Sequence, residues 1–258
     1  MNKILIVLVT GCLVFATGCS NGDAEEAAAA PNPVAPVEIY ICNYNDGMGP
    51  TDLDGAVADW NAWADEAALN DYTAWTLTKF YFGSDQDFDV IWLGTATDGK
   101  ALGRGQDNQA ANGAEVDAGF AKVVDCGAHS NFAAVQFKAP PDNDDPPSNI
   151  VLGFSDCNIA EGKNFEKDVA PAITAWIEFR TDHGSEAGHW ILFPAYGGGG
   201  EEFDFKWVTS FANHEAMGAD WDQYDVALDT KLFDGVLSCD SERVYNAANR
   251  RRAADDQG

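Results

Sequence analysis

The residue types that most often carry chemistry are scattered in this sequence. Its four histidines, His129, His183, His189 and His214, lie far apart, and no nucleophile elbow, HExxH, CxxC or dinucleotide-binding motif is present. His189, which precedes a tryptophan, and His214, at an expected helix start, are the best isolated acid or base candidates. A structural role is the more common one for histidines in such positions. The sequence therefore assigns no catalytic residue, and it predicts no metal site and no cofactor.

Six aromatic residues form a second candidate set, because they recur at a constant spacing of 115 residues. They are Trp75 with Trp190, Tyr81 with Tyr196, and Trp92 with Trp207. If they share one strand face, their indole and phenol groups would line a binding site for a small apolar or aromatic molecule. The alternative is that they fill a core between packed sheets.

The same spacing reveals an internal duplication of the chain. Residues 72–107 align with 187–222 without a gap, and ten of these 36 positions are identical. Cys42 and Cys157 keep the same offset, which shortens to 113 residues further along. The sequence therefore predicts two tandem copies of one structural unit.

The duplication sets the expected domain boundaries. The two units are expected at 37–139 and 149–252, joined by a linker at 140–148 that is rich in proline and aspartate. These residue types are typical of connecting segments. A short polar tail is expected at 253–258.

Both units show the same expected order of elements, β-α-β-β-α-β, from their apolar periodicity and turn residues. In the first unit we expect a strand at 37–42, a helix over 53–64 capped by Thr51 and Asp54, strands at 73–82 and 88–95, a helix from Asp98, and a strand at 131–138. In the second unit we expect a strand at 150–154, a helix over 165–176 capped by Asn164 and kinked or delayed by Pro171, strands at 189–196 and 203–210, a helix from Asn213, and a strand at 242–248.

Apolar groups are expected on both faces of the paired strands, so the sheet of each unit must be covered on both sides. Trp75, Tyr81 and Trp92 are expected on one face, and Phe80 and Leu93 on the other. The helices of a β-α-β-β-α-β unit cover one face only. The second face therefore needs the other unit as its partner.

This arrangement resembles the dimeric α/β-barrel superfamily, which includes antibiotic-biosynthesis monooxygenases, EthD-like proteins and NIPSNAP-like proteins. The resemblance covers nearly all of the chain after its leader and rests on element order and duplication. It implies an α+β fold in which two tandem ferredoxin-like repeats pack sheet to sheet as a pseudo-dimeric α/β barrel. Because this pseudo-dimer lies within one chain, we expect a monomer. The chain also resembles exported lipoproteins of marine bacteria.

Four cysteines remain once the leader is set aside, and an even number in an exported protein favours two disulfides. All three possible connectivities respect the repeat. We favour Cys42–Cys126 and Cys157–Cys239, because each pair would let one unit close on itself. A zinc site is the alternative, but neither pair has the short ligand spacing of such sites.

Residues 1–18 are expected to form a lipoprotein signal peptide. Lys3 precedes a short apolar run, and small residues before Cys19 resemble the bacterial lipobox, in which the cysteine is acylated. Residues 19–36 would then be the acylated cysteine and a flexible tether. Ser20 favours the periplasmic face of the outer membrane, with the acyl chains as the contact to the membrane. An ordinary secretory signal with an incidental cysteine is the alternative.

The chain is strongly acidic, with a formal net charge of −27. Without the leader and its Lys3, 14 basic residues face 42 acidic ones, which gives −28. Such a surface repels phosphate backbones, so a nucleic-acid partner is not expected.

Functions of different classes fit these features. The sequence favours a membrane-tethered periplasmic binding protein that holds a small apolar or aromatic ligand in the inter-repeat barrel. The alternative is a cofactor-independent monooxygenase-like enzyme of the dimeric α/β-barrel type, with Tyr81, Tyr196 or a histidine as proton donor. A structural or interaction lipoprotein with a filled core is the third hypothesis. The absence of a repeated histidine favours binding over catalysis.

Overall fold

The computed structural model describes residues 34–141, 147–223 and 231–254. Its first half contains β1 (Val34–Tyr44), α1 (Pro50–Glu66), β2 (Tyr72–Tyr81), β3 (Val90–Ala96), α2 (Gly99–Asn112), α3 (Ala114–Val123) and β4 (Val124–Lys138). Its second half contains β5 (Asn149–Ile159), the π-helical turn η1 (Phe165–Val169), α4 (Ala170–Asp182), β6 (Gly188–Tyr196), β7 (Phe205–Phe211), α5 (His214–Trp221), β8 (Leu237–Cys239) and β9 (Arg243–Arg251). The expected signal peptide and Cys19 lie outside the described residues.

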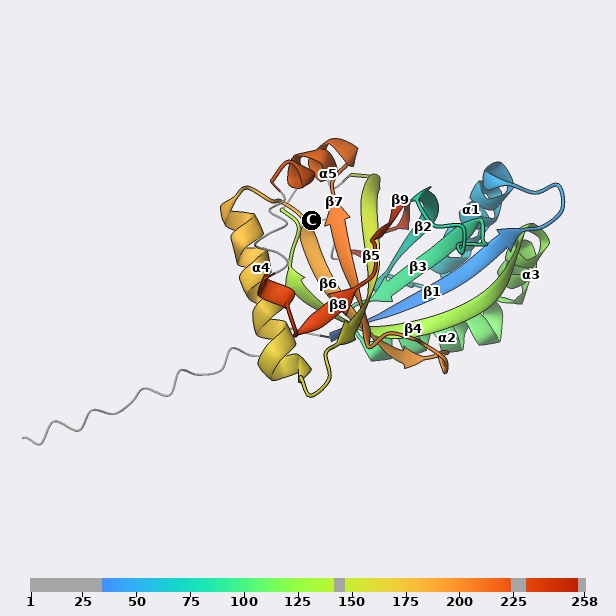
Figure 1. The fold of residues 1–258 in the computed structure, drawn as a ribbon. Helices are drawn as coiled ribbons and strands as arrows, with labels where there is room; N and C mark the ends of the chain where they lie inside the picture. Colours follow the sequence, from blue (N-terminus) through green and yellow to red (C-terminus); the bar gives the residue numbers. More distant parts are fainter. Residues whose placement is uncertain (1–33, 142–146, 224–230, 255–258) are drawn as a thin grey trace, which may run out of the picture. The chain divides into compact units, whose positions relative to one another are not determined.

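The strands close into a barrel, so the fold is α+β as expected (Figure 1). The order is β7-β6-β4-β1-β3-β2-β9-β5, and β5 pairs in turn with β7. Each half supplies four neighbouring strands to this ring. The two halves are joined at both seams by main-chain hydrogen bonds, between β2 and β9 and between β4 and β6. Helices α1, α2 and α3 cover the outside of the first half, and α4 and α5 lie against the second.

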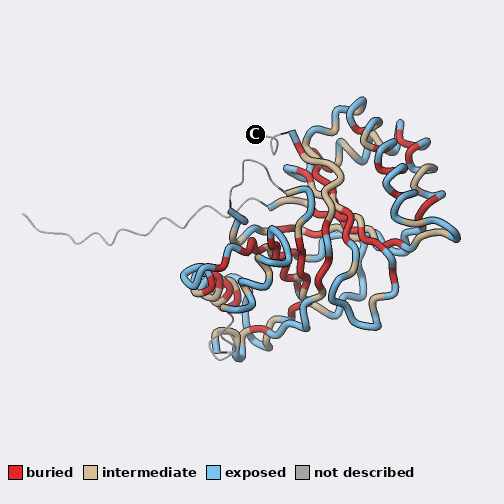
Figure 2. Tube along the Cα trace, turned by 90° about the horizontal axis from the view of Figure 1, so that it is seen from above, coloured by how far each residue is buried: buried red, intermediate tan, exposed pale blue. Residues whose placement is uncertain are grey.

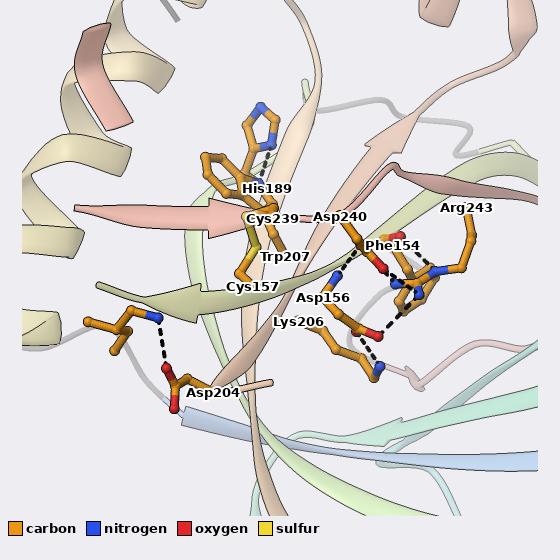
Figure 3. Close-up of a disulfide and its surroundings, with 11 residues drawn as sticks. Phe154, Asp156, Cys157, His189, Asp204, Lys206, Trp207, Cys239, Asp240 and Arg243 are labelled. Carbon is orange, nitrogen blue, oxygen red and sulfur yellow. Dashed lines mark hydrogen bonds and ion pairs between the residues drawn. A yellow bond between two sulfur atoms is a disulfide. The ribbon is translucent and has the colours of Figure 1, made fainter. Parts of the chain in front are cut away.

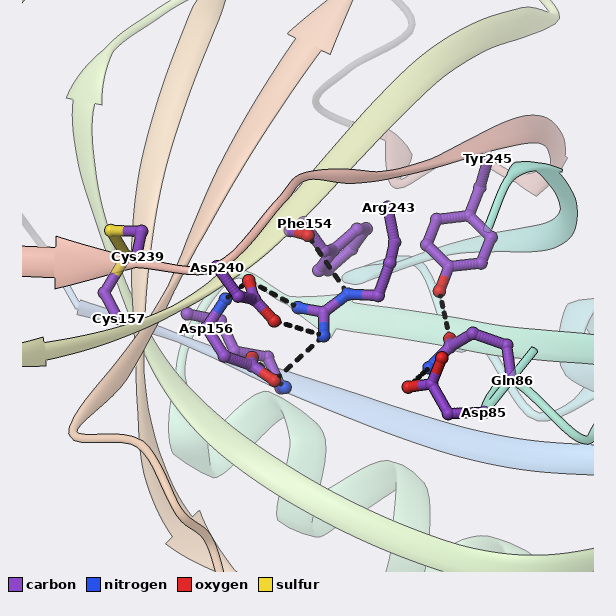
Figure 4. A network of polar contacts seen from close by, with 10 residues as sticks. Asp85, Gln86, Phe154, Asp156, Cys157, Cys239, Asp240, Arg243 and Tyr245 are labelled. Carbon is purple, nitrogen blue, oxygen red and sulfur yellow. Dashed lines mark hydrogen bonds and ion pairs between the residues drawn. A yellow bond between two sulfur atoms is a disulfide. The ribbon is translucent and has the colours of Figure 1, made fainter. Parts of the chain in front are cut away.

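The seams are reinforced by side chains from opposite halves. The Tyr245 hydroxyl in β9 donates to Gln86 Oε1 at 2.9 Å, and Arg250 in the same strand pairs with Asp54 of α1 at 2.8 Å. Figure 4 shows the first of these contacts beside Arg243, which lies between acidic side chains of the second half. Closure therefore rests on polar contacts between side chains as well as on backbone pairing.

The expected elements are present in the expected order, but the structure adds the helix α3 in the first half and the short strand β8 in the second, and several boundaries differ. β1 begins at Val34, three residues before the expected start of the strand at residue 37. α1 begins at Pro50, with Gly49 as its N-cap and the Asp52 carboxylate accepting from the Gly49 N–H at 2.9 Å. The expected Thr51–Asp54 capping pair is therefore wrong, because the helix starts earlier than its first apolar residue indicates.

The later helices begin as the sequence predicts. Asp98 and Asn213 each accept a hydrogen bond from the backbone N–H three residues on, which caps α2 and α5. Asn164 caps η1 in the same way. Pro171 falls in the first turn of α4, where its missing N–H costs no helical hydrogen bond. The delayed start that Pro171 predicts is thus confirmed.

Both disulfides have the expected connectivity. Cys42 bonds to Cys126 and joins β1 to β4, and Cys157 bonds to Cys239 and joins β5 to β8 (Figure 3). In both cases the bond connects residues that face each other across neighbouring strands. The favoured pairing, which lets each half close on itself, is confirmed.

The interior of the barrel is a packed core built by both halves. Buried positions run along the strands and along the sides of the helices that face them (Figure 2). The interior cluster consists of Val37, Ile39, Leu77, Phe88, Ile91, Leu93, Phe132, Ala134, Leu152, Phe154, Leu192, Val208, Tyr245 and Ala247. Separate clusters lie between the strands and the helices of each half. Within the described ranges, no helix has both the length and the apolar character needed to cross a membrane.

Removing either disulfide should destabilise the protein to a similar degree. The bonds close loops of 84 and 82 residues, for which the chain-entropy model gives about 4 kcal/mol each. We expect Cys42→Ala/Cys126→Ala and Cys157→Ala/Cys239→Ala to lower the free energy of unfolding by that amount, measured by urea denaturation. A loss below about 1 kcal/mol in both variants would contradict the entropic account.

Candidate functional site

A cavity of about 620 Å³ lies between the strands of the first half and the helices α1, α2 and α3. It is outside the barrel, on the face of the sheet that the helices cover. Aromatic side chains and one buried carboxylate dominate its wall, namely Glu38, Tyr40, Trp60, Tyr72, Trp92 and Phe120. A site of this size and character suits a small aromatic molecule.

Hydrogen bonds connect the polar groups of this cavity in a chain. The Trp92 indole N–H donates to the Tyr72 hydroxyl at 3.1 Å, and that hydroxyl donates to Glu38 Oε1 at 2.6 Å. The other carboxylate oxygen, Oε2, accepts from the Gln106 amide at 3.4 Å and lies 3.2 Å from His129 Nε2. Glu38 is only 5% exposed, so these contacts replace the water that its carboxylate has lost. We call Trp92, Tyr72, Glu38, Gln106 and His129 the Glu38 cluster.

The environment keeps the tyrosines of this cavity protonated. Burial, the negative charge of Glu38 and the hydrogen bond to it hold the pKa of Tyr72 well above its usual value of 10.0. The pKa of Tyr40 is also raised, first by burial and then by the carboxylates of Glu38 and Asp117. Tyr40 stacks on the His129 ring, with centroids 3.7 Å apart. Tyr72 is therefore a fixed donor to Glu38, and its oxygen remains an acceptor.

The strand register brings Tyr72 to Glu38 through a glycine. Glu38 in β1 lies opposite Gly94 in β3, and the Tyr72 side chain passes over Gly94 to reach the carboxylate. A Cβ at position 94 would lie 1.8 Å from the Tyr72 hydroxyl oxygen. Position 94 therefore has to be glycine for the backbone and the phenol to come this close.

The second half repeats the aromatic scaffold of the site but not its polar groups. Where the first half has Glu38 and Tyr72, the residues 115 positions later are Gly153 and Ala187. The candidate residues predicted from the repeat are positions that both units share, so neither Glu38 nor Tyr72 is among them. The signal that could have found them is the opposite one, a polar residue that replaces a small one within the repeat.

His189 occupies the matching region of the second half and is a buried neutral imidazole. It is 2% exposed, and Trp207 donates to its Nδ1 at 3.3 Å (Figure 3). Burial, and after it the positive charges of Lys138 and Arg180, lower its pKa to about 3. His189, one of the two acid or base candidates from the sequence, thus has a structural place in the buried core.

His214, the other isolated candidate, lies at the start of α5 as expected. Its Nε2 is 2.7 Å from the Asn246 side-chain oxygen, and its ring packs against Phe80. These contacts lie outside the Glu38 cluster.

The six repeated aromatic residues do not share one face. Trp75 and Trp190 pack against the barrel core. Trp92 and Trp207 point to the helices, where they belong to aromatic clusters with Trp60 and Trp176. The two tyrosines are exposed, Tyr81 by 59% and Tyr196 by 78%.

The register explains why the shared face was wrong. Trp75 lies opposite Leu93, so Trp92 belongs to the other face of the β2–β3 pair. Alternation within each strand fixes its own faces but not the phase between two strands across a loop. A one-residue difference in that loop moves every side chain of β3 to the opposite face.

The described residues form a second cavity but no group of metal ligands. A second cavity of about 880 Å³ is lined by residues of the barrel strands, Trp75 and Trp190 among them, and by Pro140 and Pro141. Its wall also includes members of the interior cluster, among them Leu93, Leu152 and Val208, so this cavity lies on the interior face of the barrel strands. Among the residues that the structure describes, no three His, Cys, Asp or Glu side chains gather as ligands for a metal ion.

The fold is shared with solved structures of low sequence identity. A protein from Fusobacterium nucleatum named as a candidate monooxygenase matches with a TM-score of 0.54 and 10% identity, over 86% of this chain and 94% of its own. A candidate monooxygenase from Lactobacillus acidophilus matches with a TM-score of 0.51 and 9% identity, over 86% and 97%. A candidate chlorite dismutase, TA0507, matches with a TM-score of 0.51 and 12% identity, over 87% and 98%. No family model matches the sequence, and the comparison with curated proteins gave no match.

These findings correct the expected function. The sequence favoured a binding protein with its ligand inside the barrel. The structures that share the fold are instead named as candidate monooxygenases and a candidate chlorite dismutase. The binding-protein hypothesis is therefore wrong, and the enzyme alternative agrees better with the structure.

The close approach of Tyr72 to Gly94 predicts an energetic coupling between these positions. Gly94→Ala should lower the free energy of unfolding by about 1–3 kcal/mol, because the added methyl group collides with the phenol. In a Tyr72→Ala background the same change should cost almost nothing. Urea denaturation of the four proteins measures the coupling. An equal cost in both backgrounds would contradict the collision.

His189 predicts a pH dependence of stability. Its pKa is 6.5 when unperturbed and about 3 in the folded protein. Between these values the unfolded chain binds the proton more readily, so stability is lost as the pH falls from about 6.5 toward 3, by at most about 1.4 kcal/mol per pH unit. His189→Gln should reduce the slope of the unfolding free energy against pH in this range by the contribution of one proton, measured by urea denaturation at several pH values. The exposed His183→Gln is the control, and an unchanged slope in His189→Gln would contradict the assignment.

Proposed function

We propose that the chain is a cofactor-independent, monooxygenase-like enzyme that acts on a small electron-rich aromatic molecule in the first-half cavity. The observation that carries this proposal is the chain of hydrogen bonds from Trp92 through Tyr72 to Glu38 inside an aromatic cavity. The fold likeness to candidate monooxygenases supports it. A deprotonated phenol or carbon acid can transfer electrons to dioxygen directly. The protein then has to supply a base, a path for the proton and an apolar pocket.

The Glu38 cluster provides the proton path. A proton leaving the substrate passes to the Tyr72 oxygen, while the Tyr72 proton passes to Glu38. Because the pKa of Tyr72 is held high, the tyrosine relays the proton and does not store a negative charge. Oxidation of a methylene group to a carbonyl by one O₂ then releases one water, which balances the reaction.

Other members of the cluster hold the acceptor in place. Gln106 and His129 both contact the second oxygen of Glu38, so that the first faces Tyr72. Trp92 orients the Tyr72 hydroxyl through its indole N–H. Orientation of this kind keeps the relay within hydrogen-bond distance before the substrate arrives.

We also propose that the two halves are ferredoxin-like repeats that arose by tandem duplication and now form a pseudo-dimeric barrel in one chain. Equal strand order, matching disulfides and the aligned sequences support this origin. Export and lipid attachment at Cys19 remain proposals as well. Two disulfides suit an oxidising compartment, and a tethered monomer is the form we expect there.

Oxygen uptake tests the proposed activity. The purified protein is offered a panel of one- to three-ring phenols and carbon acids, both neutral and amine-bearing, and oxygen consumption is recorded. We expect Tyr72→Phe to lower kcat/KM about 100-fold, because it removes the relay hydroxyl. Trp92→Phe should lower it less.

Matched controls come from outside the cavity. Tyr245→Phe removes a hydroxyl that is hydrogen-bonded to Gln86, and Trp207→Phe removes the indole that contacts His189. Both should change kcat/KM by less than about twofold. Full activity in Tyr72→Phe, or no oxygen uptake with any compound, would contradict the proposal.

A further inference from the structure

We propose that the first-half cavity selects an aromatic amine in its protonated, cationic form. The inference rests on the proposed function, since it names the substrate class of the same cavity. It combines the charge of the cavity wall, its aromatic surface and a comparison with the matching region of the second half.

The described residues that line the cavity carry an excess of negative charge. The acidic ones are Glu38, Asp71, Asp117 and Asp125, and the basic one is Arg104. Arg104 and Asp71 form an ion pair at 3.0 Å, which leaves three carboxylates facing the cavity. Glu38 accepts hydrogen bonds from Tyr72 and Gln106, which are neutral and do not cancel its charge, and its third neighbour is the His129 ring at 3.2 Å. A cationic ligand is therefore attracted into the cavity and an anionic one repelled.

The rise in the pKa of Tyr40 supports this negative field. After burial, its causes are the carboxylates of Glu38 and Asp117, which come from β1 and α3. The two charges therefore act from different sides on one phenol in the cavity wall.

Aromatic faces offer a second attraction for a cation. Arg251 already lies over the Trp60 ring, 5.9 Å from its centroid, and His129 covers one face of Tyr40. The remaining aromatic surface of the cavity comes from Trp92, Phe120 and the other face of Tyr40. A cation near an indole or phenol face gains about 0.5–2 kcal/mol. The same walls stack well with an aromatic ring. Cation and ring in one molecule use both features.

In the second half, the chain itself supplies a cation to the matching aromatic cluster. There the Arg180 guanidinium lies 5.4 Å from the Trp176 centroid and pairs with Asp220 at 2.7 Å, and Arg180 is 2% exposed. Trp176 corresponds to Trp60 of the first half. The aromatic cluster of the second half thus packs against a buried organic cation.

The first half has no cation at the matching position, because the guanidinium over Trp60, that of Arg251, comes from β9, pairs with Asp65 and does not line the cavity. By the same 116-residue offset that relates Trp60 to Trp176, Arg180 corresponds to Ala64. By the 115-residue offset that holds for residues 72–107, Asp220 corresponds to Gly105, which lines the cavity. The first half therefore has a cavity with surplus carboxylates in the region where the second half has the Arg180 guanidinium. We infer that the substrate brings the positive charge.

Three phenols of nearly equal size test the inference by isothermal titration calorimetry. They are tyramine, which is cationic, 4-ethylphenol, which is neutral, and 3-(4-hydroxyphenyl)propionate, which is anionic. We expect tyramine to bind about tenfold more tightly than 4-ethylphenol, and the anion to bind most weakly. Equal affinities, the reverse order or no binding of tyramine would overturn the inference.

Charge variants show whether the cavity or the whole acidic protein makes the selection. Asp117→Asn should reduce the preference for tyramine over 4-ethylphenol several-fold. Glu178→Gln removes the same charge from an exposed site on α4 and should leave the preference unchanged. Equal effects of both variants would overturn the inference, because general attraction to the acidic surface would then explain the preference.

Oxygen uptake separates this inference from the proposed function. Oxidation of neutral phenols with no preference for amines would overturn the inference and leave the proposed enzyme in place. Selective tyramine binding without oxygen uptake from any amine would support the inference and contradict the oxygenase activity.

Discussion

Closure of the barrel is the constraint on which the rest of the structure depends. Each half has a four-stranded sheet with apolar residues on both faces, and its own helices cover only one of them. The other face becomes the barrel interior, and the β2–β9 and β4–β6 seams hold the two sheets together. Since interior residues come from both halves, neither half could bury this surface alone. The site between strands and helices is therefore free to differ between the halves.

The architecture was accessible from the sequence because its signals are long and redundant. An offset of 115 residues that holds across 36 positions indicates the repeat. The repeat allows all three cysteine connectivities, and the observed one is the pairing that lets each unit close on itself. The Asp89 carboxylate accepts from the Tyr44 N–H, and the Asp204 carboxylate accepts from the Ile159 N–H, so this contact recurs at the same offset. The face of Trp92 was not accessible. It depends on the phase between two strands across a loop, which neither strand encodes by itself.

The candidate site was hidden from the sequence for a different reason. Glu38 and Tyr72 lie 34 residues apart, and their contact depends on Gly94 in a third segment. No motif spacing describes three residues brought together by a sheet register. Glu38 and Tyr72 are also absent from the positions that the two units share, because their counterparts are Gly153 and Ala187. The histidines attracted attention by residue type, yet the one that enters the cluster, His129, had no distinguishing context in the sequence.

The difference between the halves has a physical logic. In the second half, Trp176 and Trp207 contact buried His189 and belong to one core cluster with Ile173 and Phe233. In the first half, Trp60, Trp92 and Phe120 keep the same mutual contacts but border a cavity with a buried carboxylate. An open cavity and a desolvated charge both lower stability. The chain tolerates them in its first half, because the barrel seams and the packed second half stabilise the common fold. The packed second half thus stabilises the fold, and the first half holds the cavity.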